Sequence, residues 1–150
     1  MIVDLMRNDL GRVSLPGSVK IDSYAELVEY THVMHLESDL SSQVSSDVHP
    51  LDILSAVFPG GTVTGVPKLR TMEIIDELEQ TERNIYTGTI GYISFTGDMD
   101  FNIVIRSLLF KGDEASFHVG GGLTYNCVPK REYKETMNKA RSQFVALGIE

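Results

Sequence analysis

The sequence has only one cysteine, Cys127, among its 150 residues. One cysteine cannot form a disulfide within the chain, and the lack of a disulfide framework favours a reducing compartment. We therefore expect a cytoplasmic protein. A chain of this length, with 42% hydrophobic residues, can bury a core without disulfides or metal ions.

Long apolar runs and an excess of positive charge are also missing. No stretch approaches the roughly 20 apolar residues that cross a bilayer. The first residues lack the basic region and the small-residue cleavage site of a signal peptide. The 13 Lys and Arg residues are outnumbered by 21 Asp and Glu, for a net charge of -8, and such a surface repels phosphate backbones. We therefore predict no membrane and no nucleic acid as partners.

Several catalytic signatures are absent as well. The four histidines and the cysteine do not have the spacing of a zinc motif, and no serine stands in a Gly-x-Ser-x-Gly elbow. Residues 58–68 are rich in glycine and proline but lack the Gly-Lys-Ser/Thr ending of a Walker loop. This segment runs into a predicted helix N-terminus, where anions are favoured, so it is either an anion-binding loop or a simple turn.

The spacing of apolar residues predicts an α+β protein folded as one unit. Helices are expected at residues 2–10, from 49 onward, at 68–79 and at 129–147. Extended segments are expected at 13–15, 19–21, 29–40, 87–95, 101–110 and 115–119, and the last three should form an antiparallel meander. The polar residues 41–47 predict a loop. The first helix has an end signal at Gly11 but no N-cap, which suggests that it begins upstream; the alternative is a frayed N-terminal turn.

Two carboxylates and a lysine share one face of the last predicted helix. Glu132, Glu135 and Lys139 are spaced i, i+3 and i+7. Paired carboxylates suit Mg²⁺, which takes one or two of them together with water and substrate. The same spacing is also typical of a solvated charged face with an ion pair between Glu135 and Lys139.

One arginine and a run of glycines are further candidates for binding an anion. Arg106 interrupts an apolar strand, and a guanidinium is the best fork for a carboxylate or a phosphate. An edge position or a structural ion pair would explain it equally well. Gly120, Gly121 and Gly122 end a strand, where their amides could meet an anion or where the run could form a bulge or a turn.

Eight segments together resemble the chorismate-utilising enzymes. They are residues 1–13, 33–36, 58–68, 72–79, 88–92, 103–107, 120–122 and 135–140, in the order of the family's motifs. The resemblance implies the chorismate-binding fold, which is α+β with a mainly antiparallel sheet and flanking helices. It also implies chorismate as substrate and Mg²⁺ as cofactor.

The resemblance further implies roles for individual residues. Arg106 and Tyr86 would hold a carboxylate of chorismate. The backbone of Gly120, Gly121 and Gly122 would hold the substrate, and Thr62 would line the same pocket.

The metal and acid–base roles are implied in the same way. Glu135 would bind Mg²⁺ directly, Glu132 would bind it directly or through water, and Lys139 would add positive charge. His35 would assist departure of the C4 hydroxyl as an acid/base or by orienting water. Glu37 departs from the small or apolar residue usual after His35 and Leu36, and it places a charge near this proposed acid.

Within the family, residues 59–62, 64–68, 72–79 and 99–103 look closer to aminodeoxychorismate synthase. That enzyme aminates chorismate at C4 on the route to p-aminobenzoate and folate. The close alternative is anthranilate synthase, which aminates at C2 and expels pyruvate. Both imply a glutamine amidotransferase partner that supplies ammonia.

The family's first metal-binding glutamate and the lysine region that distinguishes C4 from C2 amination would precede residue 1. We therefore expect residues 1–150 to be the C-terminal portion of a chorismate-binding domain whose upstream half is missing. The remaining alternative is a non-catalytic unit that supplies half a pocket or an assembly surface, with exposed core residues that favour self-association.

Overall fold

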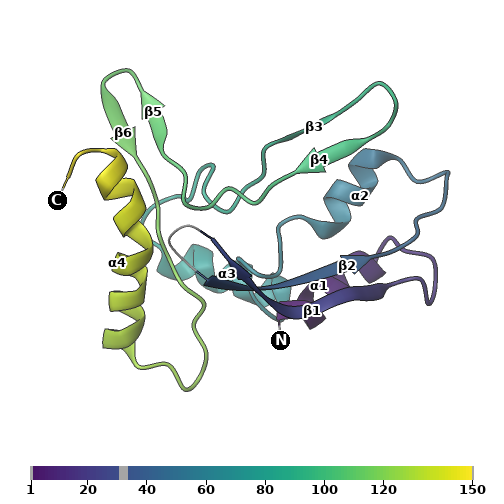
Figure 1. The fold of residues 1–150 in the computed structure, drawn as a ribbon, viewed down its shortest axis with the longest axis horizontal. Helices are drawn as coiled ribbons and strands as arrows, with labels where there is room; N and C mark the ends of the chain where they lie inside the picture. Colours follow the sequence, from purple (N-terminus) through teal and green to yellow (C-terminus); the bar gives the residue numbers. More distant parts are fainter. Residues whose placement is uncertain (1, 31–33, 150) are drawn as a thin grey trace. The chain divides into compact units, whose positions relative to one another are not determined.

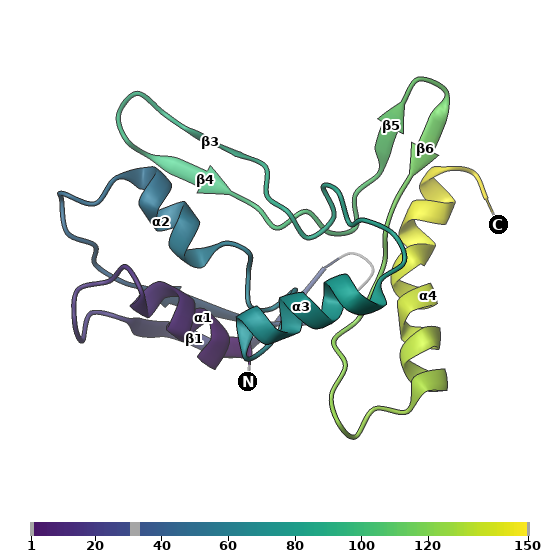
Figure 2. The same cartoon turned by 180° about the vertical axis from the view of Figure 1, so that it is seen from behind.

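The computed structural model describes residues 2–30 and 34–149. The chain divides into two compact units, which we call the N-terminal unit (Met1–Leu78) and the C-terminal unit (Glu79–Glu150). Each combines helices with antiparallel strands (Figures 1 and 2), which confirms the predicted α+β class. None of the helices in the described part of the chain is long and apolar enough to cross a membrane.

The N-terminal unit contains three helices and one long hairpin. The helices are α1 (Ile2–Gly11), α2 (Pro50–Val57) and α3 (Lys68–Leu78), and the hairpin joins β1 (Lys20–Glu29) to β2 (Met34–Ser41). Helix α1 contacts both α2 and β2. The predicted helix boundaries are confirmed to within a few residues.

Helix α2 begins where the sequence predicts. The Nδ1 atom of His49 accepts a hydrogen bond from the Leu51 amide at 3.2 Å. Pro50 occupies the first turn, where its missing N–H costs nothing. The two features together satisfy or remove donors that the helix itself cannot pair.

The predicted strand at residues 29–40 is wrong in extent. Glu29 ends β1 and pairs with Met34, the first residue of β2. The sequence between them carries no glycine, proline or other turn signal, so the alternation of residue types does not show where β1 ends. Residues 31–33 of the predicted strand lie outside the described residues.

The C-terminal unit contains two short hairpins and the longest helix. The hairpins pair β3 (Gly91–Ile93) with β4 (Met99–Phe101), and β5 (Leu109–Lys111) with β6 (Glu114–Ser116). Helix α4 (Pro129–Ala146) begins at a proline and is followed by Gly148 at φ 70°. These ends are the ones predicted from the sequence.

The predicted meander of three long strands is wrong. Backbone hydrogen bonds do extend the β3–β4 ladder, because the Thr87 amide donates to the Val104 carbonyl and the Val104 amide donates to Gly88. The chain then turns, with the Ile105 amide bonded to the Ile103 carbonyl and Arg106 at φ 52°. A left-handed residue interrupts the regular extended backbone here, and β4 and β5 belong to separate hairpins.

Much of the apolar surface of both units is uncovered. The accessible surface is 11773 Å², whereas two separate compact units of half this mass would expose about 9,000 Å². Val104 and Ala140 are the buried apolar residues among those described. In the long hairpin, the directly paired Leu27 and Leu36 are 62% and 71% exposed. The strands therefore present faces that other polypeptide could cover.

Candidate functional site

The site in the C-terminal unit is built where the chain leaves β6 and runs alongside α4 (Figure 1). Phe117 packs edge-on against Phe144 of the helix, with ring centroids 5.3 Å apart. Further along, a Cβ atom added to Gly121 would lie 3.7 Å from Lys139 Nζ and 4.0 Å from Glu132 Oε2. The glycine run therefore passes the charged face of α4.

Gly120 meets Tyr86 at the same place. A Cβ atom on Gly120 would lie 2.9 Å from the Tyr86 hydroxyl oxygen, which is closer than real Cβ atoms come to other groups. Only glycine permits this approach without movement of the ring. The structure thus brings together Tyr86, the glycine run and the face of α4 that carries Glu132 and Lys139.

Neighbouring side chains fix the Tyr86 ring. His118 stacks on it with centroids 5.5 Å apart and an interplanar angle of 17°, and the Arg83 guanidinium lies 5.9 Å from its centroid. Burial raises the pKa of Tyr86. The hydroxyl is therefore neutral at physiological pH and can donate a hydrogen bond to a carboxylate.

Arg83 is itself held by Glu79. Its Nε and Nη2 atoms donate to the two carboxylate oxygens at 2.8 and 2.5 Å. This fork lowers the pKa of Glu79 and raises that of Arg83, in both cases mainly through the hydrogen bonds. The ion pair with Glu79 therefore holds the Arg83 guanidinium in place beside the Tyr86 ring.

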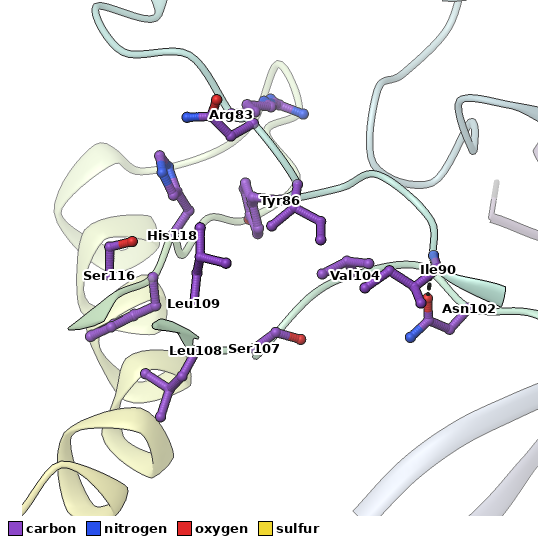
Figure 3. Close-up of a pocket in the computed structure, with 13 residues that line it drawn as sticks. Arg83, Tyr86, Ile90, Asn102, Val104, Ser107, Leu108, Leu109, Ser116 and His118 are labelled. Carbon is purple, nitrogen blue, oxygen red and sulfur yellow. Dashed lines mark hydrogen bonds between the residues drawn. The ribbon is translucent and has the colours of Figure 1, made fainter. Parts of the chain in front are cut away.

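A cavity of 210 Å³ opens on this side of the C-terminal unit. Figure 3 shows Tyr86 and His118 on one side of it and Val104, Ser107 and Asn102 on another. The volume is below the roughly 300–1,000 Å³ typical of small-molecule sites. A ligand the size of chorismate would need walls beyond those that this unit supplies.

Glu135 lies next to Lys139 on the exposed side of the helix. Lys139 Nζ is 2.7 Å from Glu135 Oε1, and this hydrogen bond lowers the pKa of the carboxyl group. The i,i+4 ion pair foreseen as an alternative for this face is therefore present. The pair occupies one carboxylate oxygen of Glu135, Oε1.

The donor set fits Mg²⁺ in chemistry but is small. Glu132 and Glu135 offer carboxylate oxygens, the ligands that Mg²⁺ prefers. Within residues 2–30 and 34–149, however, no group of three His, Cys, Asp or Glu side chains is placed to hold a metal ion. Two carboxylates suffice only if water and substrate complete the shell.

Arg106 is not gathered into this cluster by any hydrogen bond. Its side chain is exposed on the stretch between β4 and β5, and it makes no hydrogen bond or ion pair to another described residue. Its left-handed backbone conformation lies at the turn that separates β4 from β5. The structural ion pair considered for Arg106 is thus not formed within the described chain.

His35 and Thr62 belong to the N-terminal unit. His35 is half-buried on β2, where the Tyr30 ring meets it edge-on at 5.8 Å. The Tyr30 hydroxyl donates to the Glu37 carboxylate, which raises the pKa of Tyr30. Tyr30 thus contacts both His35 and Glu37. Thr62 is exposed in the loop between α2 and α3.

Sequence reasoning missed two side chains at the C-terminal site and a buried one further along the same helix face. His118 stacks on Tyr86, Thr136 Oγ1 would lie 3.8 Å from a Cβ on Gly121, and Gln143 is 3% exposed with its Nε2 unpaired among described atoms. Thr136 and Gln143 share the helix face of Glu132 and Lys139 by 3.6-residue spacing. That spacing was the signal available for finding them.

Comparison with known proteins places this arrangement in a family. The chorismate binding enzyme family matches residues 1–144, and the chain belongs to it. It is 50% identical over 149 residues to aminodeoxychorismate synthase component 1 of Bacillus subtilis (strain 168), covering 99% of this chain and 32% of that protein. It is 46% identical over 149 residues to anthranilate synthase component 1 of Thermococcus kodakarensis, covering 99% of this chain and 34% of that protein.

Solved structures agree with the fold. Anthranilate synthase component I from Streptococcus pneumoniae TIGR4 superposes with a TM-score of 0.87 at 44% identity, over 95% of this chain and 33% of that one. The predicted chorismate-binding fold is thus confirmed. The chain spans about a third of the length of the relatives it matches.

Proposed function

We propose that this chain contributes to an enzyme that aminates chorismate at C4 to give 4-amino-4-deoxychorismate. The observation that carries the proposal is the convergence of Tyr86, Gly120, Gly121, Glu132 and Lys139 in one unit. The 50% identity to an aminodeoxychorismate synthase component 1 supports the C4 product. Anthranilate synthases reach 46%, so C2 amination for tryptophan synthesis is the competing function.

The residues of the site suit a dianionic substrate. The Tyr86 hydroxyl and the glycine amides can donate hydrogen bonds to one carboxylate, and the guanidinium of Arg106 is the proposed bidentate fork for a carboxylate of the substrate. Lys139 adds a positive charge beside Gly121. Thr62, in the N-terminal unit, is a further proposed substrate contact through its hydroxyl group.

The leaving group is the chemical difficulty of the reaction. A C4 hydroxyl departs as water only if it receives a proton, and His35 is the proposed acid or the residue that orients the water which delivers the proton. Glu132 and Glu135 would hold Mg²⁺, which would supply Lewis-acid polarisation and orientation of the substrate. The ammonia would come from a glutamine amidotransferase subunit, in keeping with the component 1 names of the relatives.

Product analysis tests this proposal directly. The full-length protein is mixed with chorismate, Mg²⁺ and ammonia, and the products are separated by chromatography. We expect aminodeoxychorismate; anthranilate with pyruvate would show C2 amination instead. Arg106→Ala should remove about 2–5 kcal/mol of transition-state stabilisation, as expected for a lost charge-assisted contact, and unchanged kcat/KM would contradict its role.

The uncovered apolar faces support a second proposal about assembly. Among the described residues, each of the three sheets has two strands, and a two-stranded sheet is marginal in water without further strands or packing. We propose that the active enzyme covers these faces with polypeptide equivalent to the two-thirds of its relatives that this chain does not match. Chorismate turnover by the 150 residues alone would exclude this dependence.

A further inference from the structure

The N-terminal unit contains a carboxylate that the proposed chemistry does not use. Asp9, on α1, is 7% exposed and is the least exposed acidic residue among those described. A buried carboxylate is costly unless its oxygens are paired and hydrogen-bonded. The partners of Asp9 therefore show what it holds in place.

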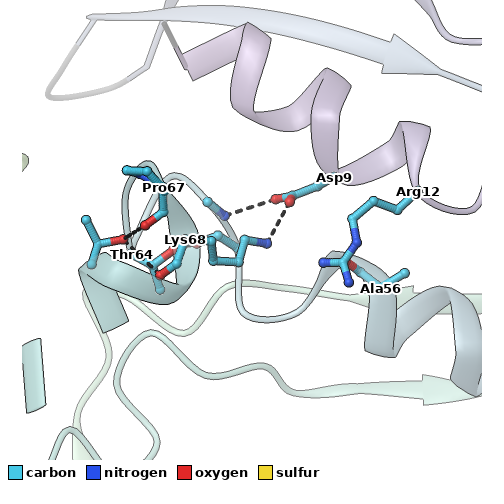
Figure 4. Close-up of polar contacts among 9 residues, drawn as sticks. Asp9, Arg12, Ala56, Thr64, Pro67 and Lys68 are labelled. Carbon is cyan, nitrogen blue, oxygen red and sulfur yellow. Dashed lines mark hydrogen bonds and ion pairs between the residues drawn. The ribbon is translucent and has the colours of Figure 1, made fainter. Parts of the chain in front are cut away.

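The two oxygens of Asp9 hold two ends of one loop (Figure 4). Oδ2 accepts a hydrogen bond from the Gly61 amide at 3.1 Å. Oδ1 accepts one from Lys68 Nζ at 2.6 Å, at the start of α3. Residues 61–68 are thus attached to α1 at both ends through a single side chain.

The contact leaves no space at Gly61. A Cβ atom there would lie 3.2 Å from Asp9 Oδ2 and 3.3 Å from the Cβ of Leu5. Gly61 is buried whereas the next residue, Thr62, is exposed. Within the loop, the Val63 amide and the Thr64 hydroxyl both donate to the Gly60 carbonyl, so the segment that presents Thr62 moves as one turn.

We infer that Asp9 is a positioning residue that fixes the 60–64 turn, which carries the proposed substrate contact Thr62. The role of Thr62 in this inference rests on the proposed function. The attachment of the loop to Asp9 rests on the two hydrogen bonds alone. An aspartate suits the task because its two oxygens accept from two donors. Asparagine at this position offers one acceptor and one NH₂ group, so either Gly61 or Lys68 loses its partner.

The test compares variants in the full-length protein. Asp9→Asn removes one of the two attachments, and Gly61→Ala displaces the turn while the carboxylate is intact. The matched control is Glu73→Gln, since Glu73 forms an exposed ion pair with Arg70 on α3. Steady-state kinetics with chorismate and amide hydrogen exchange of residues 60–64 are measured for each, with circular dichroism to verify folding.

We expect Asp9→Asn and Gly61→Ala to raise KM for chorismate about fivefold, the scale of one lost hydrogen bond, with kcat changed less than twofold. Exchange of the 60–64 amides should accelerate in both, and Glu73→Gln should match the unaltered protein. A merely structural role would lower activity in proportion to the folded fraction, with KM constant.

Unchanged KM in a folded Asp9→Asn protein would overturn the inference. If Asp9→Asn does not fold, Lys68→Met is a milder variant, because it retains the hydrogen bond from Gly61 to Asp9. We expect Lys68→Met to raise KM for chorismate by a smaller factor. Absence of chorismate turnover in the unaltered protein would overturn the proposed function and the role of Thr62. The exchange rates would then still confirm or overturn the attachment of the loop by Asp9.

Discussion

Replacement of Gly120 by alanine tests whether Tyr86 and the glycine run form one site. Gly120 is not among the glycines with positive φ, so alanine suits the backbone there. The cost arises from the side chain alone. Its Cβ would lie 2.9 Å from the Tyr86 hydroxyl oxygen, and either the ring or the backbone has to move.

The magnitude follows from what holds the ring. Tyr86 can yield only by disturbing its stack with His118 and its contact with Arg83. Overpacking of this kind costs about 1–3 kcal/mol. For a domain of 60–100 residues, a loss of 1 kcal/mol lowers Tm by roughly 4–8 °C. A decrease of several degrees in the Tm of the C-terminal unit is therefore expected.

The assay is thermal unfolding followed by circular dichroism, with two matched variants. Gly122→Ala is the control, because nothing lies within 4 Å of a Cβ at that position. Tyr86→Phe removes the obstructing oxygen and leaves Cζ at 4.0 Å, an ordinary contact. The double variant Gly120→Ala with Tyr86→Phe should therefore recover most of the lost stability. Equal Tm values for Gly120→Ala and Gly122→Ala, or no recovery in the double variant, would refute the reasoning.

Three further predictions concern charge and exposed surface. The hydrogen bonds of Arg83 lower the pKa of Glu79, so the Glu79–Arg83 pair should stabilise the fold at pH values above the ordinary pKa of 4.5. This stabilisation should be lost as pH falls through the lower pKa of the folded state. Urea unfolding from about pH 3 to pH 7 should therefore show that the difference in unfolding free energy between Glu79→Gln and the unaltered chain vanishes at acid pH. Lys139→Met should raise the pKa of Glu135 toward its usual range, because the lysine lowers it, and a ¹³C NMR titration that shows no change would contradict the ion pair. Leu36→Asp should reduce concentration-dependent self-association of the 150-residue chain in sedimentation experiments, because it interrupts an exposed apolar face; an unaltered chain that stays monomeric at all concentrations would contradict this.

The helices were predictable because their signals are local. Pro50, Pro129 and Gly148 mark ends that depend on backbone chemistry within a few residues. The strand pattern was less informative, since the run at residues 101–110 is mostly apolar yet turns at Ile105 and Arg106. Pairing between distant segments decides where a strand stops, and alternation along one segment does not contain that information.

Some residues of the candidate cluster were predictable from the sequence, but their arrangement was not. Spacing placed Glu132, Glu135 and Lys139 on one helix face, and the structure agrees, with the ion pair between Glu135 and Lys139 in place. No local pattern shows that Gly121 passes that face or that Gly120 touches Tyr86. Those contacts join residues far apart along the chain.

The sequence by itself determined the family, the helix ends and the types of side chain available for binding an anion, because each depends on residue identity and on neighbours along the chain. Only the tertiary structure decided that Tyr86 stacks on His118, that Asp9 binds both Gly61 and Lys68, and that large apolar faces are left uncovered. The physical reason is that such contacts depend on distances in space between elements, which chain spacing does not specify.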